Sequence, residues 1–207
     1  MAFHYGDNVR LPEAGEYTAQ ITIGPPTASL SGQLAGLLES PVTREITFEY
    51  QPADIHGLTF DLVDEGRRGS RGALPLMDHQ HAPLSKGQPV ADLSGQLLGE
   101  DSSGDAAISV LFQEPSPLAE SGHYLAVLMR TPYNDVPLPG AILSLETVEG
   151  THELEERIDP SLGHHYGTAV SSIPDSVEIT VETPPPVARH DGYETAFLSF
   201  DPIDIST

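Results

Sequence analysis

The sequence predicts an all-β protein whose antiparallel strands pack as a β-sandwich. Short segments alternate apolar and polar residues, which is the period-two pattern of half-buried strands. These segments end at glycine, proline or acidic residues of the kind that form turns. No segment sustains the 3.6-residue period of an amphipathic helix. From residue 105 onward, six or seven such strands fall in roughly 100 residues, which is typical of an immunoglobulin-like sandwich.

An internal duplication organises the chain. Residues 163–200 contain His-Tyr-Gly, then Val, a turn, an alternating strand and three prolines, and residues 3–26 contain a weaker copy. In both copies one face of the strand is apolar, with Val177, Ile179 and Val181 on the later strand. We therefore predict a duplicated β module. Residues 1–52 would be the C-terminal part of a first repeat, and residues 53–207 a complete second repeat.

The predicted strands follow in chain order. The first repeat contributes Glu16–Ile23 and Arg44–Tyr50, joined by the connection Thr27–Ser40, whose glycines disfavour a helix. The second repeat begins with Ile55–Val63, followed by a long loop, Asp64–Asp92. The remaining predicted strands are Ala106–Phe112, Tyr124–Arg130, Ala141–Val148, His152–Ile158, Val177–Glu182 and Glu194–Phe200.

One strand and the first repeat carry further expectations. Tyr124–Arg130 is apolar through Met129, as expected of a central strand covered on both faces. The first repeat lacks the strands that precede His-Tyr-Gly in the second, so its apolar face needs a cover. Packing between the repeats or a homodimer would provide it.

The charge of the chain limits the classes of molecule that it is expected to bind. Among 207 residues, 31 are acidic and 9 are basic, which gives a net charge of −22. Nucleic acids and anionic membrane surfaces are disfavoured as partners, because both are polyanions. Scattered carboxylates with a single lysine, Lys86, resemble the composition of proteins from extreme halophiles, where salt screens self-repulsion. Without cysteine the chain has neither disulfides nor thiolate metal sites.

Neither a membrane span nor a leader is expected within the sequence as it stands. No apolar segment approaches 18 residues, and no charged-then-apolar leader precedes Phe3. Since the first repeat begins at its own His-Tyr-Gly, any leader would lie upstream. No nucleophile elbow, phosphate-binding glycine loop or His-Glu-x-x-His motif is present, so we expect no enzymatic activity.

The histidines are the candidate metal ligands. His164 and His165 precede Tyr166-Gly167, and His4 occupies the matching place in the first repeat. His190 follows the prolines of the second repeat. A third cluster alternates a thioether with two imidazoles, a combination that favours copper, and alternate residues of an extended segment share one face. Its members are Met77, His79 and His81.

Structural roles compete with these assignments. The His-Tyr-Gly motif would then be a corner, with its imidazole bonded to a backbone carbonyl and its glycine at positive φ. The Met77 cluster would be a chance grouping in a loop. The isolated histidines His56, His123 and His152 are expected to be ordinary surface or core residues.

The order His-Tyr-Gly-x-x-Val, a strand ending in Pro-Pro, then Arg-His and Glu-Thr resembles the periplasmic iron-transport-associated proteins. That family binds copper or iron in a single immunoglobulin-like sandwich. The resemblance implies His165, His190 and His4 as metal ligands. Two further ligands of the family have no counterpart, because Arg157–Ser161 holds no Met and Ala106–Phe112 holds no His. Two such modules in an acidic chain resemble the haloarchaeal iron-transporter-like proteins, usually anchored outside the membrane.

The sequence therefore predicts an extracytoplasmic accessory of iron or copper uptake, lipid-anchored in its full-length form and serving a membrane transporter. His165 and His190 would hold the ion, supplemented by His164 and by Met77, His79 and His81. The alternative is a structural or protein-interaction sandwich that has lost the metal.

Overall fold

The structure is a computed structural model that describes residues 11, 13–51, 64–67, 86–120, 122–186 and 197–206. The chain forms two compact units, Met1–Pro26 with Gly36–Arg68, and Thr27–Ala35 with Gly69–Thr207. Across the described ranges the regular elements are strands and short 3-10 helices, so the all-β prediction is confirmed. None of those helices has the length and apolar character needed to cross a bilayer.

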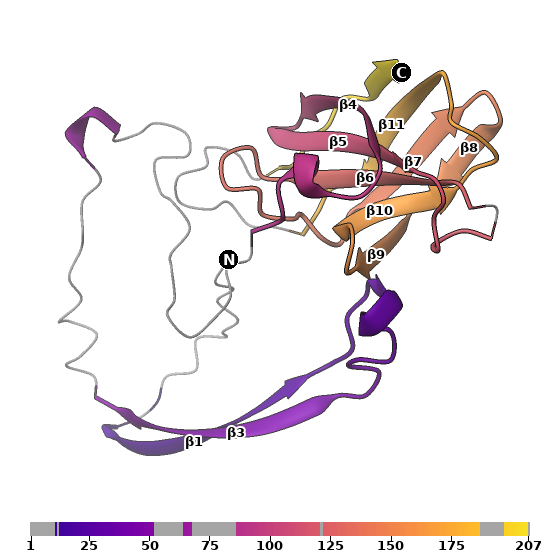
Figure 1. Cartoon of the computed structure of the whole chain (residues 1–207). Coiled ribbons are helices and arrows are strands. Elements are labelled where there is room, and N and C mark those ends of the chain that lie inside the picture. Colours follow the sequence, from indigo (N-terminus) through magenta and orange to yellow (C-terminus); the bar gives the residue numbers. More distant parts are fainter. Residues whose placement is uncertain are drawn as a thin grey trace. The chain divides into compact units, whose positions relative to one another are not determined.

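The larger unit is a sandwich of two sheets that lie face to face (Figure 1). In order across the sheet, the six-stranded sheet contains β2 (Ser29–Leu30), β9 (Glu155–Asp159), β10 (Gly163–Ala169), β6 (Tyr124–Arg130), β5 (Ala106–Gln113) and β4 (Gln96–Ser103). The four-stranded sheet contains β12 (Ile203–Ser206), β11 (Ser176–Thr183), β7 (Ile142–Thr147) and β8 (Gly150–Glu153). Described neighbours are antiparallel except β2, which pairs with β9 in parallel.

The central strand β6 is covered on both faces, as its apolar sequence predicts. It lies between β5 and β10, and all seven of its residues are buried. Successive side chains of a strand point to opposite faces. Tyr124, Ala126 and Leu128 pack in a cluster with Leu93, Leu111 and Leu162, which Val90 and Leu118 partly cover. The alternate residues of β6 therefore face the other sheet, where the buried apolar residues include Leu143, Leu145, Val177, Ile179, Ile203 and Ile205.

The predicted strand His152–Ile158 is wrong as a single element. It is divided into β8 and β9, which belong to different sheets. Leu154 lies between them, and its backbone N–H donates to the carbonyl of Leu143. Its side chain is buried, so the crossing from one sheet to the other adds an apolar group to the interior.

The C-terminal strand also differs from the prediction. Within the predicted strand Glu194–Phe200, residues 197–200 are described, and they form no strand. Phe197 has a φ of 55°, which is incompatible with an extended chain. The last strand is instead β12, which pairs with β11.

Strand β4 was missed in the sequence because its composition, Gln-Leu-Leu-Gly-Glu-Asp-Ser-Ser, resembles a turn. It pairs with β5 along its length, with an irregularity between Leu97 and Gly99. The loop predicted at Asp64–Asp92 contains the short 3-10 helices η2 (Glu65–Arg67) and η3 (Val90–Asp92) among its described residues. The predicted strand Ile55–Val63 lies outside the described residues.

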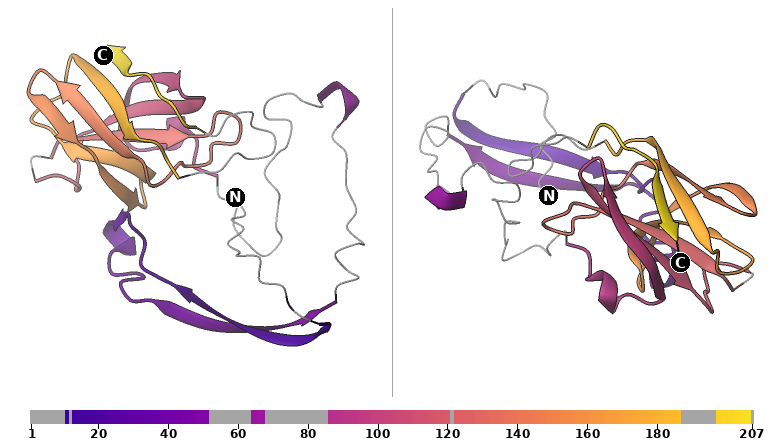
Figure 2. Two further views of the ribbon diagram at one scale, coloured as in Figure 1. Left: turned by 180° about the vertical axis from the view of Figure 1, so that it is seen from behind. Right: turned by 90° about the horizontal axis from the view of Figure 1, so that it is seen from above.

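The smaller unit contains a two-stranded antiparallel ribbon, β1 (Gly15–Ile23) and β3 (Val42–Tyr50) (Figure 2). The connection predicted as Thr27–Ser40 contains two short regular elements. It contains β2 and the 3-10 helix η1 (Gly32–Leu34). Segment Thr27–Ala35, assigned by sequence to the first repeat, is part of the larger unit. The assignment of the domains to two repeats stays a prediction.

Candidate metal-binding histidines

The His-Tyr-Gly motif lies within strand β10, and not at a corner as the alternative structural role predicted. β10 pairs with β9 from Gly163 to Gly167 and with β6 from Tyr166 to Ala169. Because successive residues of a strand point to opposite faces, His164 and His165 lie on opposite faces of the sheet. In this arrangement one ion does not contact both imidazoles.

His165 is completely buried, and both of its ring nitrogens have partners. Nδ1 lies 3.0 Å from the carbonyl oxygen of Gly163, and Nε2 lies 3.3 Å from the hydroxyl of Tyr124. Since a carbonyl only accepts, Nδ1 carries the proton and Nε2 accepts from Tyr124. Burial lowers the pKa of His165, which favours the neutral ring. For Nε2 to bind a metal, the Tyr124 hydroxyl must turn away.

Tyr166 connects β10 by hydrogen bonds to the segment that precedes β7. Its hydroxyl donates to the carbonyl of Leu138 at 2.7 Å and accepts from the N–H of Ala141 at 3.0 Å. The ring is completely buried, and this burial raises the pKa of Tyr166. The tyrosine of the motif is therefore a structural residue that satisfies two backbone groups.

Gly167 is required for a reason other than the predicted positive φ, which it does not have. A Cβ at this position would lie 2.3 Å from the hydroxyl oxygen of Tyr124 and 2.6 Å from the carbonyl oxygen of Leu125. The glycine thus leaves room for the Tyr124 side chain to cross β10 and reach His165.

His164 has a different environment from His165. Its side chain is 9% exposed, and its Nε2 lies 2.8 Å from a carboxylate oxygen of Glu156 on β9. Its Nδ1 is buried and has no hydrogen-bond partner among the described residues. The ring meets that of Tyr166 edge to face, with centroids 5.3 Å apart.

Glu156 holds the His164 ring in place as a carboxylate. Burial raises the pKa of Glu156. Hydrogen bonds from His164 and from the N–H of Gly140 lower the pKa and together outweigh burial, so the net shift is downward. An ionised carboxylate only accepts, so the Nε2 of His164 carries a proton, and in the neutral ring the lone pair is on Nδ1. Metal-ligating histidines commonly donate one ring N–H to a carboxylate and bind the ion through the other nitrogen.

The other predicted ligands lie outside the described residues: His4, Met77, His79, His81 and His190. Within the described ranges, no three His, Asp or Glu residues are grouped so as to hold a metal ion. The structure therefore contributes one candidate ligand with an available nitrogen, His164, and one whose nitrogens are both engaged, His165.

Sequence analysis did not single out the residues that support these rings, Glu156, Tyr124 and Gly140. In a chain with so many acidic residues, the presence of one Glu in the sequence does not indicate a site. Its place opposite Tyr166 in the β9–β10 register is what brings it near His164. Only strand pairing reveals that proximity.

A family model described as a domain of unknown function (DUF7350) matches residues 91–206, more than half of the 207 residues. The chain belongs to this family. The match covers every strand of the sandwich except β2, which comes from the N-terminal part of the chain.

Residues 2–51 match a second family model, described as Fe2+ transport protein. This match confirms the resemblance to iron-transport proteins that the His-Tyr-Gly and Pro-Pro motifs predicted. Curated proteins gave no match.

Similar solved structures include two copper-containing proteins. A copper-bound variant of FetP from uropathogenic Escherichia coli strain F11 is 12% identical, with 54% of this chain and 94% of that chain covered at a TM-score of 0.41. The copper-reconstituted P19 protein from Campylobacter jejuni is 13% identical, with 53% of this chain and 90% of that chain covered at a TM-score of 0.37.

Proposed function

We propose that this protein binds a copper or iron ion outside the cytoplasm and acts, without turnover, as an accessory of metal uptake. The observation that carries the proposal is the His164 ring, whose Nε2 is fixed by Glu156 while its buried Nδ1 has no described partner. A buried polar atom without a hydrogen bond is costly, and an ion at Nδ1 would relieve that cost. The similarity of residues 2–51 to Fe2+ transport proteins gives independent support.

The remaining ligands are proposed from the predicted set. The imidazole of His190 and the alternating Met77, His79 and His81 have the nitrogen and thioether donors that copper and iron accept. His4 belongs to the other compact unit and is proposed as a ligand only within that unit. In this proposal Glu156 orients His164 and does not bind the ion. The alternative arrangement, with His165 in place of His164, requires Nε2 to exchange its bond with Tyr124 for the metal.

The cellular setting is part of the same proposal. The protein would act at the outer side of the membrane, lipid-anchored in its full-length form. Its partner would be a membrane transporter that receives the ion.

Calorimetric titration of the full chain with Cu2+ and Fe2+, in concentrated salt, tests the proposal. We expect saturable binding with a Kd below about 1 µM, weakened at least tenfold in His164→Ala and in His190→Ala. His123→Ala is the matched control, because both nitrogens of the His123 ring already have partners, Ser171 and Glu114, and its removal should leave the affinity unchanged. Loss of affinity in His165→Ala with none in His164→Ala would transfer the site to the other face of the sheet.

A structural or protein-interaction module is the second candidate. It is favoured by the engagement of both His165 nitrogens. No saturable binding of either ion by the intact chain would select this candidate.

A further inference from the structure

A segment from the N-terminal part of the chain completes one edge of the six-stranded sheet. This docked segment, Thr27–Ala35, contains β2 and η1 and belongs to the larger unit. β2 pairs with β9 in parallel, and the N–H of Ser31 donates to the carbonyl of Ile158 at 3.0 Å. The family model that matches residues 91–206 does not include the docked segment, whereas the Fe2+ transport model that matches residues 2–51 does. The region of one family match therefore supplies an edge strand to the sandwich of the other.

Side chains also hold the docked segment on β9. The hydroxyl of Ser29 donates to the carboxylate of Glu155. The same carboxylate accepts from the guanidinium of Arg157, which lies opposite Ser29 in the strand register. Ala28 and Ser31 are buried. The fit of the docked segment to β9 thus includes polar and buried contacts as well as backbone pairing.

The strand register leads from the docked segment to the candidate histidine. Leu30 lies opposite Ile158 on β9, and Ile158 lies opposite His164 on β10. Residues directly opposite each other share a face of the sheet, so Leu30 and Ile158 lie on the face of His164. Glu156, two residues before Ile158, lies on that face as well and accepts the hydrogen bond from His164. β9 therefore carries the residue that orients His164 and has β2 on one side and β10 on the other.

Thr27, at the start of the docked segment, reaches the Glu156 carboxylate itself. Burial raises the pKa of Glu156, and hydrogen bonds from His164, from the N–H of Gly140 and from the Thr27 hydroxyl lower it. His164 and Glu156 have side chains that are 9% and 14% exposed, so this group of contacts is largely shielded from water. The carboxylate that orients the His164 ring is thus held in part by the docked segment.

We propose that the docked segment positions His164 for ion binding by holding Glu156 on β9, an inference that rests on the proposed function. With the segment docked, β9 is paired on both sides and Glu156 has the Thr27 hydroxyl as a partner. With the segment released, β9 becomes an edge strand and Glu156 loses that partner. Because the same contacts serve docking and the orientation of His164, ion binding and docking strengthen each other by the same factor.

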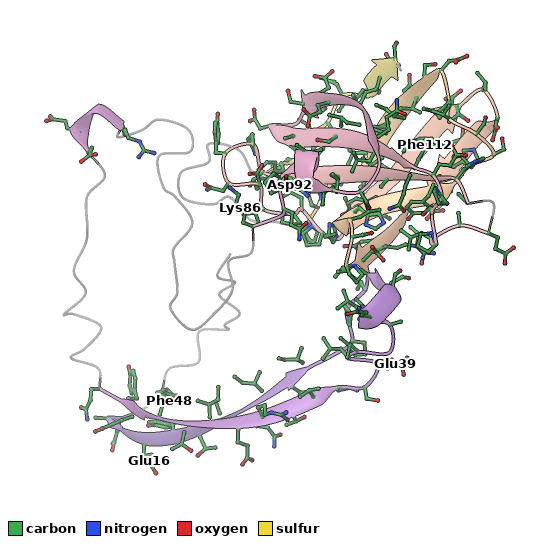
Figure 3. All side chains as sticks on the ribbon, viewed as in Figure 1. Glu16, Glu39, Phe48, Lys86, Asp92 and Phe112 are labelled. Carbon is green, nitrogen blue, oxygen red and sulfur yellow. The ribbon has the colours of Figure 1, made fainter. Side chains whose placement is uncertain are left out.

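Two glycines provide a matched pair of variants. Gly32 and Gly36 have φ values of 58° and 81°, so a side chain strains the backbone at both. A Cβ at Gly32 would lie 3.2 Å from the ring of Pro160, which follows β9. A Cβ at Gly36 would lie 3.7 Å from a carboxylate oxygen of Glu39, an ordinary contact in the stretch between η1 and β3 (Figure 3). Gly32→Val should therefore release the docked segment, and Gly36→Val should leave it docked.

The first measurements need no metal. The full chain is studied in concentrated KCl with a chelator, by hydrogen exchange of the docked segment and by NMR of the His164 ring. In the wild type and in Gly36→Val we expect a protected segment and a ring that carries its proton on Nε2. In Gly32→Val we expect exchange of the segment to be about tenfold faster and both ring tautomers to be populated. Circular dichroism should show the same strand signal in all three proteins.

Thr27→Val separates the contact with Glu156 from docking, because it removes the hydroxyl and keeps the shape of the side chain. We expect it to disturb the His164 ring with little change in the exchange of the docked segment. Thr27→Ser keeps a hydroxyl and should restore the wild-type ring. This pair decides the proposal if Gly32→Val fails to fold.

Titration with Cu2+ then measures the coupling. Gly32→Val should bind Cu2+ about tenfold more weakly than Gly36→Val, and saturating Cu2+ should slow exchange of the docked segment in the wild type. A His164 ring that is unchanged in both Gly32→Val and Thr27→Val would overturn this inference. Equal Cu2+ affinities of Gly32→Val and Gly36→Val would also overturn it, and in either case a wild type that binds Cu2+ keeps the proposed function. A wild type that binds no Cu2+ would overturn the proposed function, while a ring that still responds to Gly32→Val would support its positioning by the docked segment.

Discussion

Gly167 determines how the candidate histidines are arranged. Without a Cβ, it allows the phenol of Tyr124 to cross β10 and to occupy Nε2 of His165. The same close approach buries the Tyr124 ring and raises the pKa of its hydroxyl, mainly through desolvation. The hydroxyl therefore stays protonated and remains a donor to His165.

Replacing Gly167 by Ala tests this packing. The added methyl would lie 2.3 Å from the Tyr124 hydroxyl oxygen, so the strand or the ring must shift. We expect a loss of about 1 to 3 kcal/mol in the free energy of unfolding, measured by denaturant titration. Thr168→Ala, the neighbouring change on β10, is the control and should cost less. Equal stability of Gly167→Ala and the wild type would contradict the assigned role.

His123 and His165 respond to pH in opposite directions. The Nδ1 of His123 lies 2.6 Å from the carbonyl oxygen of Ser171, and its Nε2 lies 3.0 Å from a carboxylate oxygen of Glu114. Both partners accept, so the charged ring satisfies both bonds. The bond to Ser171 and then that to Glu114 raise the pKa of His123 above 6.5, whereas burial lowers that of His165 below 6.5.

The sign of each contribution follows from these shifts. The raised pKa of His123 means that its stabilisation is complete below pH 6.5 and is lost as the pH rises through the folded-state value. The lowered pKa of His165 means that the unfolded chain takes up a proton first, so stability falls as the pH drops from 6.5 toward the folded-state value. Denaturation midpoints should therefore lose part of their acid dependence in His165→Gln and part of their alkaline dependence in His123→Gln. The reverse pattern in the two variants would refute both assignments.

At the scale of elements, Tyr166 connects the two sheets. It lies on β10 of one sheet, and its hydroxyl bonds with Leu138 and Ala141, which precede β7 of the other sheet. Leu138 and Ala141 are themselves buried, so water does not readily replace the Tyr166 hydroxyl as their partner. The hydroxyl is thus a specific link between the layers.

Tyr166→Phe should lower the free energy of unfolding by about 1 to 3 kcal/mol, because it leaves a buried carbonyl and a buried N–H without their partner. Tyr50→Phe is the matched control, since the Tyr50 ring packs on Tyr17 and has no hydrogen bond within the described part of the chain. Thermal unfolding followed by circular dichroism would measure both. If the two variants melt at the same temperature, the link does not contribute.

The sequence predicted elements where one physical signal dominates. β6 was predicted at its observed bounds, because a short segment that is apolar at nearly every position is typical of a central strand buried on both faces. β4 was missed because glycine, aspartate and serine occupy a strand whose pairing with β5 supplies its stability. The His164 and His165 pair was identified as a candidate site, but its division between two faces depends on the segment being a strand, which its pairing with β6 and β9 stabilises. That pairing is a long-range property that local sequence does not contain.

At the scale of the whole molecule, the chain carries a large excess of negative charge. The 31 acidic residues exceed the 9 basic ones, and the described ion pairs are few and largely exposed, such as Lys86 with Asp135 at 3.3 Å. Exposed pairs contribute little to stability. Mutual repulsion of the carboxylates therefore opposes the compact state, and it acts over a distance that depends on salt.

Salt should consequently stabilise the fold. Raising KCl from about 0.01 M to about 1 M shortens the Debye length from roughly 30 Å to roughly 3 Å, which removes most repulsion between separate surface carboxylates. We expect the melting temperature to rise steeply over this range and the strand signal in circular dichroism to be lost in dilute buffer. Sucrose at matched osmolality is the control, because it stabilises compact states by exclusion from the protein surface without screening charge, and it should give a smaller rise than KCl. A melting temperature that is the same in dilute and concentrated KCl would show that the carboxylates are already compensated in the folded chain.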